Sequence, residues 1–378
     1  MLITRVGLIA GLAVGAVALT ACGSSKSSSP SDASTASAGG SASTSASTSN
    51  IACVSGTSLK AEGSTAQKNA MDQWIKDYTA KCGGTVTYNG TGSGAGVSNF
   101  IAKQDNFAGS DSALDPAKGE IAKAAAACGS PALDLPMVVG PIAITYKVNG
   151  VTDLTLTPTV LTKIFLGKIT TWNDPAIKAL NSSANLPSTK ITVFYRSDSS
   201  GTTQNFERYL AANDAADFTS KPDKDSSKAG FAGQGKTGSQ GVQQAISSTE
   251  GAIGYDEWSF AVSGNLDTAK IDNGGGAVEL NADTAGAAVA AAKVASNGGQ
   301  DLTLKLNYAT KASGAYPIIL VTYEIACSKY SDAKIGSQVK SFLTYTANGG
   351  QASLKDLGYA PLPSSIQSKV QAAVATIG

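Results

Sequence analysis

The chain has 378 residues, of which 42% are hydrophobic, and its 29 basic and 28 acidic residues give a net charge of +1 at pH 7. This length exceeds one ordinary hydrophobic core and predicts two lobes. The near-neutral charge offers no basic surface to phosphodiester backbones, so no nucleic-acid partner is expected. The chain contains no histidine, which excludes Ser-His-Asp and Cys-His nucleophiles and His-ligated metals. The composition therefore favours a binding protein over an enzyme, without a metal or other cofactor.

The N-terminus has the pattern of an export signal. Residues 1–21 hold one early positive charge and a short apolar run, "VGLIAGLAVGAVA", which is too short to span a membrane comfortably. The run ends in "LTAC" (19–22), which resembles the bacterial lipobox, and this resemblance implies that Cys22 is the first mature residue and carries a diacylglyceryl thioether. An ordinary signal peptide with an unrelated cysteine is the alternative. Residues 22–50, nearly all Ser, Ala, Thr and Gly after Cys22, predict a disordered tether. We therefore expect a protein anchored by lipid to the extracytoplasmic face of the cell membrane.

From residue 58 onward, strand and helix patterns alternate. Strands are expected at 58–63, 85–89, 106–111, 137–148, 252–258 and 316–327, with a further strand that ends at Tyr195. Helices are expected at 65–82, 96–102, 115–128, 158–166, 174–181, 333–346 and 364–376, with a further helix that begins at about Ser200. Such alternation predicts an α/β fold with mixed, mostly parallel sheets. The long apolar strand near the end of the chain indicates that the C-terminus returns to the first lobe. We predict lobe 1 at 51–147 plus 312–378, and lobe 2 at 148–311.

Four cysteines remain in the body of the chain: Cys53, Cys82, Cys128 and Cys327. An even number in an exported domain predicts two disulfides, for which three pairings are possible. None of these cysteines has the close spacing of a zinc knuckle. We expect Cys53–Cys82 and Cys128–Cys327, since Cys53 precedes the first strand and Cys82 ends the helix that returns from it.

Three predicted helix starts have the same composition, glycine together with serine or threonine. They are "EGSTAQ" (62–67), "GTGSGAG" (90–96) and "SDSSGTT" (197–203); a further strand end, "GSDSA" (109–113), carries Asp111. Helix N-termini present unpaired N–H groups and a partial positive charge, so they suit anions. Each hydroxyl has the alternative role of capping its own helix, and Arg196 that of an ion pair with Asp198. Together with Arg196, the three sites favour one small oxyanion bound between the lobes.

Six segments in combination closely resemble the phosphate-binding proteins of bacterial ABC importers, the PstS family. They are "GSTAQKNAMDQWIKDY", "YNGTGSGAGVSNFIA", "FAGSDSAL", "IFLGKITTWNDPAI", "RSDSSGTTQNF" and "GAIGYDEWSF", and the resemblance runs from about Leu59 to the C-terminus. It implies a two-lobed, type II periplasmic-binding-protein (Venus-flytrap) fold, with actinobacterial members as the most similar in their lipobox, tether and cysteines. The implied phosphate contacts are Ser64, Thr65, the backbone of Ala66, Ser93, Asp111, Arg196, Ser200, Gly201 and Thr202, with Asp198 supporting the arginine. At position 66 some relatives carry a larger side chain, a minor departure because the expected contact is the backbone N–H.

Several other functions compete with this interpretation. "GFAGQGKT" (230–237) fits the P-loop pattern, but a polar, lysine-rich segment precedes it, so we expect a flexible loop. "GTGSGA" (90–95) fits a dinucleotide-binding turn, which the export signal and the other two hydroxyl-rich helix starts disfavour. A phosphatase, a surface adhesin or scaffold, and a binding protein for sulfate or another tetrahedral oxyanion are the remaining alternatives. We predict a monomeric, non-enzymatic protein that captures inorganic phosphate and delivers it to the membrane permease of an ABC importer.

Overall fold

The computed structural model describes residues 51–290, 292–295 and 299–378. The predicted signal peptide (1–21), the lipidation of Cys22 and the tether up to residue 50 lie outside these residues and stay predictions. In the described part of the chain, none of the helices combines the length and the apolar character needed to cross a membrane.

One nine-stranded sheet organises the described residues, in the order β2-β1-β3-β14-β4-β8-β6-β7, with β9 paired to β4. Its strands are β1 (Ser58–Gly63), β2 (Thr85–Gly90), β3 (Phe107–Ser110), β4 (Ala132–Lys147), β6 (Thr192–Arg196), β7 (Gln234–Lys236), β8 (Ala252–Glu257), β9 (Asp267–Thr268) and β14 (Ile319–Cys327). Pairing is parallel at both ends of the sheet and antiparallel in the middle, where β14 lies between β3 and β4. The predicted mixed α/β sheet is confirmed, but parallel pairing does not predominate in it, because the parallel pairs are confined to the two ends and the long middle strands pair antiparallel.

The long strands β4 and β14 form the middle of this sheet. The first part of β4 pairs with β14, whereas Ile142–Lys147 pairs with β8. Nearly every residue of both strands is buried, as expected for strands covered on both faces. The pairing slips between Thr322 and Tyr323, opposite Pro136, which has no N–H to give to the ladder. This irregularity lies close to the candidate site described below.

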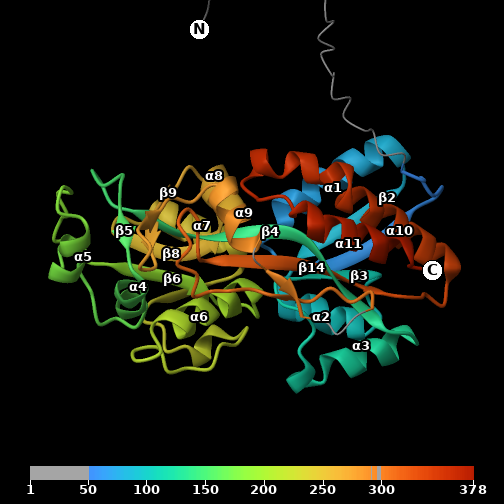
Figure 1. Ribbon diagram of the computed structural model, residues 1–378, viewed down its shortest axis with the longest axis horizontal. Helices are drawn as coiled ribbons and strands as arrows, with labels where there is room; N and C mark the ends of the chain where they lie inside the picture. The colour runs from blue at the N-terminus through green and yellow to red at the C-terminus, as the bar shows by residue number, and fades with distance from the viewer. Residues whose placement is uncertain (1–50, 291, 296–298) are drawn as a thin grey trace, which may run out of the picture. The chain divides into compact units, whose positions relative to one another are not determined.

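Helices cover both faces of the β2-β1-β3 end (Figure 1). On one face are α1 (Lys68–Cys82), α10 (Ala333–Ala347) and α11 (Ser364–Ala375); on the other are α2 (Ser93–Ile101) and α3 (Glu120–Cys128). The first face buries Trp74 and Phe342 in a large core, and the second buries Val97 and Phe100 in a smaller one. We call β1–β3, α1–α3, α10 and α11 the first lobe.

A separate core forms around the β8-β6-β7 end. Its helices are α4 (Pro158–Phe165), α5 (Pro175–Leu180), α6 (Gly201–Asn213), α7 (Gly238–Ser248) and α8 (Trp258–Ser263). Phe165, Phe206 and Tyr255 pack ring against ring at its centre, with centroids 4.6–5.9 Å apart. We call β5 (Thr155–Leu156), β6–β8 and α4–α8 the second lobe. The predicted two-lobed fold is present, while the predicted lobe boundaries stay a prediction because one continuous sheet joins the two cores.

The remaining elements are short. They are α9 (Ala282–Ala290), β10 (Lys270–Asp272), β11 (Ala277–Val278), β12 (Lys293–Val294) and β13 (Leu304–Lys305), with 3₁₀ turns at Pro116–Lys118, Ser226–Lys228, Gly349–Ser353 and Lys355–Leu357. The helix expected at 115–128 is divided, because Gly119 has a φ of +69° and separates the first 3₁₀ turn from α3. The first helix begins at Lys68 rather than 65, which leaves Ser64–Gln67 as a turn after β1.

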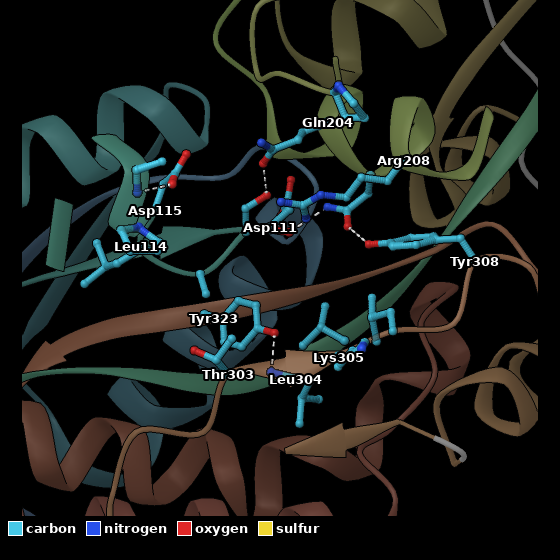
Figure 2. A pocket seen from close by; sticks show the side chains of 18 of the residues that line it. Asp111, Leu114, Asp115, Gln204, Arg208, Thr303, Leu304, Lys305, Tyr308 and Tyr323 are labelled. Atoms are coloured by element: carbon cyan, nitrogen blue, oxygen red, sulfur yellow. Dashed lines mark hydrogen bonds between the residues drawn. The ribbon is translucent and has the colours of Figure 1, made fainter. Parts of the chain in front are cut away.

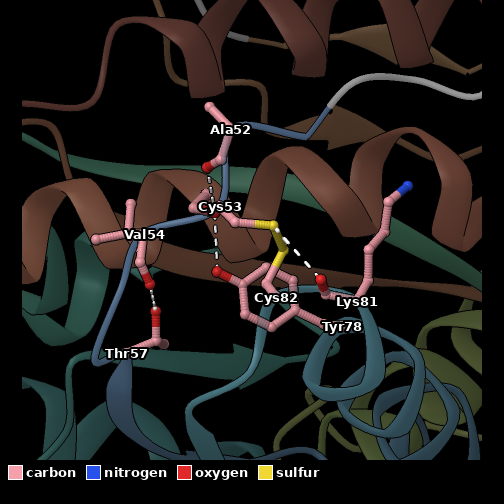
Figure 3. Close-up of a disulfide and its surroundings, with 8 residues drawn as sticks. Ala52, Cys53, Val54, Thr57, Tyr78, Lys81 and Cys82 are labelled. Carbon is pink, nitrogen blue, oxygen red and sulfur yellow. Dashed lines mark hydrogen bonds between the residues drawn. A yellow bond between two sulfur atoms is a disulfide. The ribbon is translucent and has the colours of Figure 1, made fainter.

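Both predicted disulfides are confirmed. Cys53 is bonded to Cys82 and Cys128 to Cys327, with Cα–Cα distances of 5.1 and 5.5 Å. Around the first bond (Figure 3), the Tyr78 hydroxyl lies 2.8 Å from that of Ser341, which donates to the Ala52 carbonyl. The start of the described chain is therefore fixed to α1 and α10 by both covalent and hydrogen bonds.

The two disulfides close loops of very different length, with sequence separations of 29 and 199 residues. In the chain-entropy account, the longer loop stabilises the fold by about 1–2 kcal/mol more. We expect the Cys128→Ala/Cys327→Ala chain to lose that much more stability than the Cys53→Ala/Cys82→Ala chain, measured by urea denaturation followed by circular dichroism. Equal losses in the two double variants would contradict this expectation.

Candidate anion-binding site

Four turns of the chain meet between the lobes. Residues 64–67, 91–92, 111–115 and 197–200 each follow the carboxyl end of a parallel strand, respectively β1, β2, β3 and β6. Three of the turns lead into helices α1, α2 and α6, whose first N–H groups have no partners within their own helices. The carboxyl ends of strands from both lobes therefore come together at one point, as the sequence predicts.

Asp111 lies at the centre of these turns and is buried, with 2% of its surface exposed. Its Oδ1 accepts hydrogen bonds from the hydroxyls of Ser64 and Thr322, the latter at 2.9 Å. Its Oδ2 accepts from Thr202 at 3.1 Å and from Ser93 at 3.3 Å. A carboxylate surrounded by four hydroxyl donors is in the acceptor role of its ionised form. No cation contacts it among the described residues.

The first turn of α6 contacts the first lobe directly. The Gly201 N–H donates to Ser93 Oγ at 3.2 Å, and the Asn205 side chain donates to the Asp111 carbonyl at 2.7 Å. A Cβ on Gly201 would lie 2.7 Å from the Asp111 Cβ and 2.8 Å from Ser93 Oγ, closer than side chains pack. Glycine at this position therefore allows the lobes to come together. The Ser200 hydroxyl instead caps α6, accepting from the Thr203 N–H at 3.2 Å.

Arg196, at the end of β6, is 1% exposed and paired with Asp198. Its Nε donates to Asp198 Oδ1 at 2.7 Å, and its Nη1 lies 3.4 Å from the Thr202 hydroxyl and 3.3 Å from that of Ser239. Burial alone would raise the pKa of Asp198, but the guanidinium and the Gly238 N–H hold that pKa below its ordinary value. The pair predicted from the sequence therefore exists, and it orients Arg196 toward the hydroxyl cluster.

Asp256, at the end of β8, is a further buried carboxyl of the site, and its pKa is shifted in the opposite direction to that of Asp198. Burial raises the pKa of Asp256 well above its ordinary value, although the charge of Arg196 opposes this shift. Asp198 is the carboxylate that pairs with Arg196. Because the charge of Arg196 is already paired, the site would hold an anion mainly through hydrogen-bond donors.

The other predicted contacts lie at the edge of this cluster. The Ala66 N–H donates to Ser64 Oγ at 3.1 Å. The Thr65 hydroxyl lies 3.2 Å from Ser239 Oγ and accepts from the Ser239 N–H, also at 3.2 Å. The structure thus brings together all the predicted site residues, with the Ser200 hydroxyl directed to its own helix.

Sequence reasoning missed Thr322 and Ser239. Thr322 is one of the few polar residues within the apolar run 316–327, and that polarity was the available signal. Ser239 follows "GFAGQGKT", where the sequence predicts only a flexible loop. That expectation is corrected: the segment contains β7 and leads into α7, whose first turn holds Ser239. The signal was again a glycine-hydroxyl pattern, "KTGS", at a helix start.

A pocket of about 570 Å³ adjoins the site on its solvent side (Figure 2). In the wall of this pocket, the Ser112 hydroxyl donates to Gln204 Oε1 at 2.6 Å. This bond and the bond from Asn205 to the Asp111 carbonyl join the turn after β3 to α6. Figure 2 shows Gln204 and Arg208 of α6 facing the 303–305 segment across it. The charged and hydroxyl groups of its wall include Arg208, Lys221, Lys305, Asp115, Tyr308 and Tyr323.

Comparison with known proteins places this arrangement in a family. Residues 30–349 match the model of the PBP superfamily domain. Phosphate-binding protein PstS2 of Mycobacterium bovis is 44% identical over 373 residues, covering 97% of this chain and 96% of that relative. Phosphate-binding protein PstS 3 of Mycobacterium leprae is 42% identical over 382 residues and covers both chains fully. The chain belongs to the PstS family of phosphate-binding proteins.

Solved structures of this kind share the fold. A high-affinity periplasmic phosphate-binding protein, PfluDING, determined with bound phosphate, has a TM-score of 0.69 at 24% identity and covers 84% of this chain and 93% of its own. A DING protein has a TM-score of 0.67 at 26% identity and covers 83% and 94%. The predicted resemblance to actinobacterial PstS proteins and the predicted fold class are therefore both confirmed.

The Arg196–Asp198 pair should be important for stability. Asp198→Asn would leave a buried guanidinium without its carboxylate, which typically costs about 3–5 kcal/mol. Because the pKa of Asp198 is lower in the folded than in the unfolded chain, the pair stabilises fully above the ordinary carboxyl pKa of about 4 and loses this effect at lower pH. We expect denaturation experiments to show a large deficit in Asp198→Asn at pH 7 that shrinks in acid.

Asp72→Asn is the matched control, because it removes an exposed ion pair with Lys68. Such pairs contribute at most about 1 kcal/mol. A similar small effect of both variants at pH 7 would show that Asp198 does not stabilise the buried arginine.

Proposed function

We propose that this PstS-family protein binds inorganic phosphate through Asp111 and the surrounding hydroxyls, N–H groups and Arg196. It is a non-enzymatic, extracytoplasmic binding protein that delivers phosphate to the permease of an ABC importer. The "LTAC" sequence supports a lipid on Cys22 as its membrane anchor. The observation that carries the assignment of the site is a buried carboxylate surrounded by hydroxyl donors from both lobes.

Phosphate suits this arrangement because it is both an acceptor and a donor. Its oxygens would accept from the hydroxyls of Ser64, Ser93 and Thr202, which would turn from Asp111 to the ligand, and from the Gly201 N–H and Arg196. Charge-assisted hydrogen bonds of this kind contribute about 1.5–3 kcal/mol each, part of which is lost in desolvating the anion and closing the lobes. Phosphate near neutral pH also keeps at least one hydrogen, which it can donate to Asp111. Sulfate has no hydrogen to donate there.

Asp111 should therefore select phosphate over sulfate. A site built to pair a ligand hydroxyl rejects an analogue lacking it by about 10⁴–10⁵-fold, because a buried acceptor is left unpaired. In titration calorimetry of the full-length chain at neutral pH, we expect phosphate and arsenate to bind and sulfate to give no measurable heat. Asp111→Asn should keep useful phosphate affinity and gain sulfate binding, since an amide removes the repulsion.

Asp115→Asn is the control for this experiment, because Asp115 caps the nearby 3₁₀ turn through the Ala117 N–H. It should keep the selectivity of the parent. Failure of the parent to bind phosphate would overturn the proposed function. Exclusion of sulfate by Asp111→Asn as strong as in the parent would show that another group is the selector.

Gly201 offers a test of lobe closure. Alanine is a better helix former than glycine, so Gly201→Ala should leave the melting temperature of the ligand-free chain close to that of the parent. Its methyl group would overlap Asp111 and Ser93 only when the lobes are together. We expect phosphate affinity to fall by about 1–3 kcal/mol, the usual cost of an extra methyl in a packed site.

Gly286→Ala on α9 is the matched control, because a Cβ there meets no atom within 4 Å. Calorimetry should give the parent's phosphate affinity for Gly286→Ala. Unchanged affinity in Gly201→Ala would mean that the lobes bind phosphate without the contact seen between Gly201 and the first lobe.

A further inference from the structure

The pocket beside the proposed phosphate site is a separate hollow. It lies between α6 on one side and the turn after β3 and the 303–308 segment on the other (Figure 2). None of the described residues whose hydroxyls donate to the Asp111 carboxylate lines it, and Arg196 does not line it either. The pocket therefore has a lining of its own, which could hold a ligand in addition to the one bound at Asp111.

Three basic side chains line this pocket. Arg208 comes from α6, Lys221 from the loop that follows α6, and Lys305 from β13. Figure 2 shows Arg208 and Lys305 on opposite sides of the pocket. Within the described part of the chain none of the three forms an ion pair with a carboxylate, whereas Lys224 and Lys228 of the same loop do. The pocket therefore gathers positive charge that the described acidic groups leave unpaired.

Both acidic residues of the lining are engaged elsewhere. The Asp111 carboxylate is surrounded by the hydroxyls of the phosphate site, and its carbonyl accepts from Asn205 in the pocket wall. Asp115 Oδ1 accepts from the Ala117 N–H at 2.8 Å and so caps a 3₁₀ turn. Three like charges around one hollow repel one another, and an anion that enters the hollow relieves this repulsion. The lining therefore favours a negatively charged ligand.

Two buried side chains add hydrogen-bond donors to the same pocket. Tyr323 of β14 is 4% exposed and accepts from the Leu304 N–H at 3.0 Å, and its own hydroxyl hydrogen has no acceptor among the residues that the structure describes. Gln204 is 7% exposed and accepts from the Ser112 hydroxyl through Oε1, while its Nε2 has no acceptor in the described segments. Buried donors without acceptors are costly, so a ligand with several oxygens would stabilise this wall.

We propose that this pocket is a second anion site, which takes a small polyanion with several charged oxygens. Its volume of about 570 Å³ is within the usual range for small-molecule sites and larger than a five-atom ion such as phosphate requires. Arg208 can hold two oxygens of one phosphoryl or carboxylate group side by side, and Lys221 and Lys305 add single charges. Short inorganic polyphosphates and polycarboxylates both present such oxygens.

Calorimetry of the full-length chain tests this site with pyrophosphate and citrate as the two probes. Saturating phosphate is present throughout, so that the Asp111 site is filled and the lobes are held together. A salt concentration of about 0.15 M limits the Debye length to about 8 Å, which suppresses binding to the general surface. We expect one-to-one binding of at least one probe, and the probe that binds identifies the chemistry of the ligand.

Single charge-removing variants locate the bound probe. Arg208→Gln should weaken its binding about tenfold or more, the loss expected for one charge-assisted hydrogen bond, and the exposed Lys305→Gln should weaken it less. Lys178→Gln is the matched control, because Lys178 is exposed near the end of α5 and does not line the pocket. It should keep the parent's affinity. Phosphate affinity and melting temperature should stay close to those of the parent in all three variants, which separates loss of the second site from loss of folding.

The outcomes are distinct. If neither probe binds the phosphate-saturated parent, or if phosphate displaces the probe, the pocket is not a second anion site, although phosphate binding itself is unaffected. Equal affinities in Arg208→Gln, Lys305→Gln and Lys178→Gln would assign the binding to another surface and likewise overturn the inference. Absence of phosphate binding in the parent would instead overturn the proposed function, and the comparison of Arg208→Gln with Lys178→Gln would still decide the second site.

Discussion

The burial of the Asp111 carboxylate between two lobes, where none of the described cations contacts it, constrains the structure around it. Such a group is tolerable only if hydrogen-bond donors reach it from all sides. Ser64, Ser93 and Thr322 reach it from the elements beside β3, and Thr202 reaches it from α6. This requirement explains why three strand ends, a slipped strand register and a helix N-terminus all converge there. Because Thr202 belongs to the second lobe, Asp111 receives this hydrogen bond only when the two lobes are in contact.

Recognition in such a site depends on hydrogen atoms more than on charge. Arg196 is paired with Asp198, so an entering anion meets mainly oriented dipoles. Dipoles fixed by the fold need no reorganisation when the ligand arrives, and each is directed at a particular oxygen. A ligand with the same charge and shape but a different number of hydrogens is therefore distinguishable from phosphate.

Much of this arrangement could be predicted because its signals are local. The glycine-hydroxyl patterns at 62–67, 90–96 and 197–203 lie at helix starts in both sequence and structure, and the cysteine pairing followed from the expected position of α1. The misses have physical causes. Helix α7 has only Val242 and Ile246 as large apolar residues, which is too few for a visible periodicity, so Ser239 was overlooked.

Other features depend on contacts between distant parts of the chain. Thr322 reaches Asp111 because of the register of β14 against β3 and β4, which no local pattern encodes. The hydrogen bonds from Gln67 to Tyr88 and from Tyr88 to the Ser64 carbonyl likewise join the turn after β1 to β2. The break at Gly119 could have been predicted only in part. The glycine is a signal for a helix end, but the residues on both sides of it have a helical pattern, which predicted one continuous helix.

The Cys128–Cys327 bond has a topological consequence. It converts residues 128 to 327 into a covalent ring that contains β4, the elements of the second lobe and all of β14. A single backbone cut anywhere inside that ring leaves one molecule, since both fragments remain joined through sulfur. A protease outside the cytoplasm can therefore cut an exposed loop of the second lobe without separating Arg196 and Thr202 from Ser64, Ser93 and Asp111.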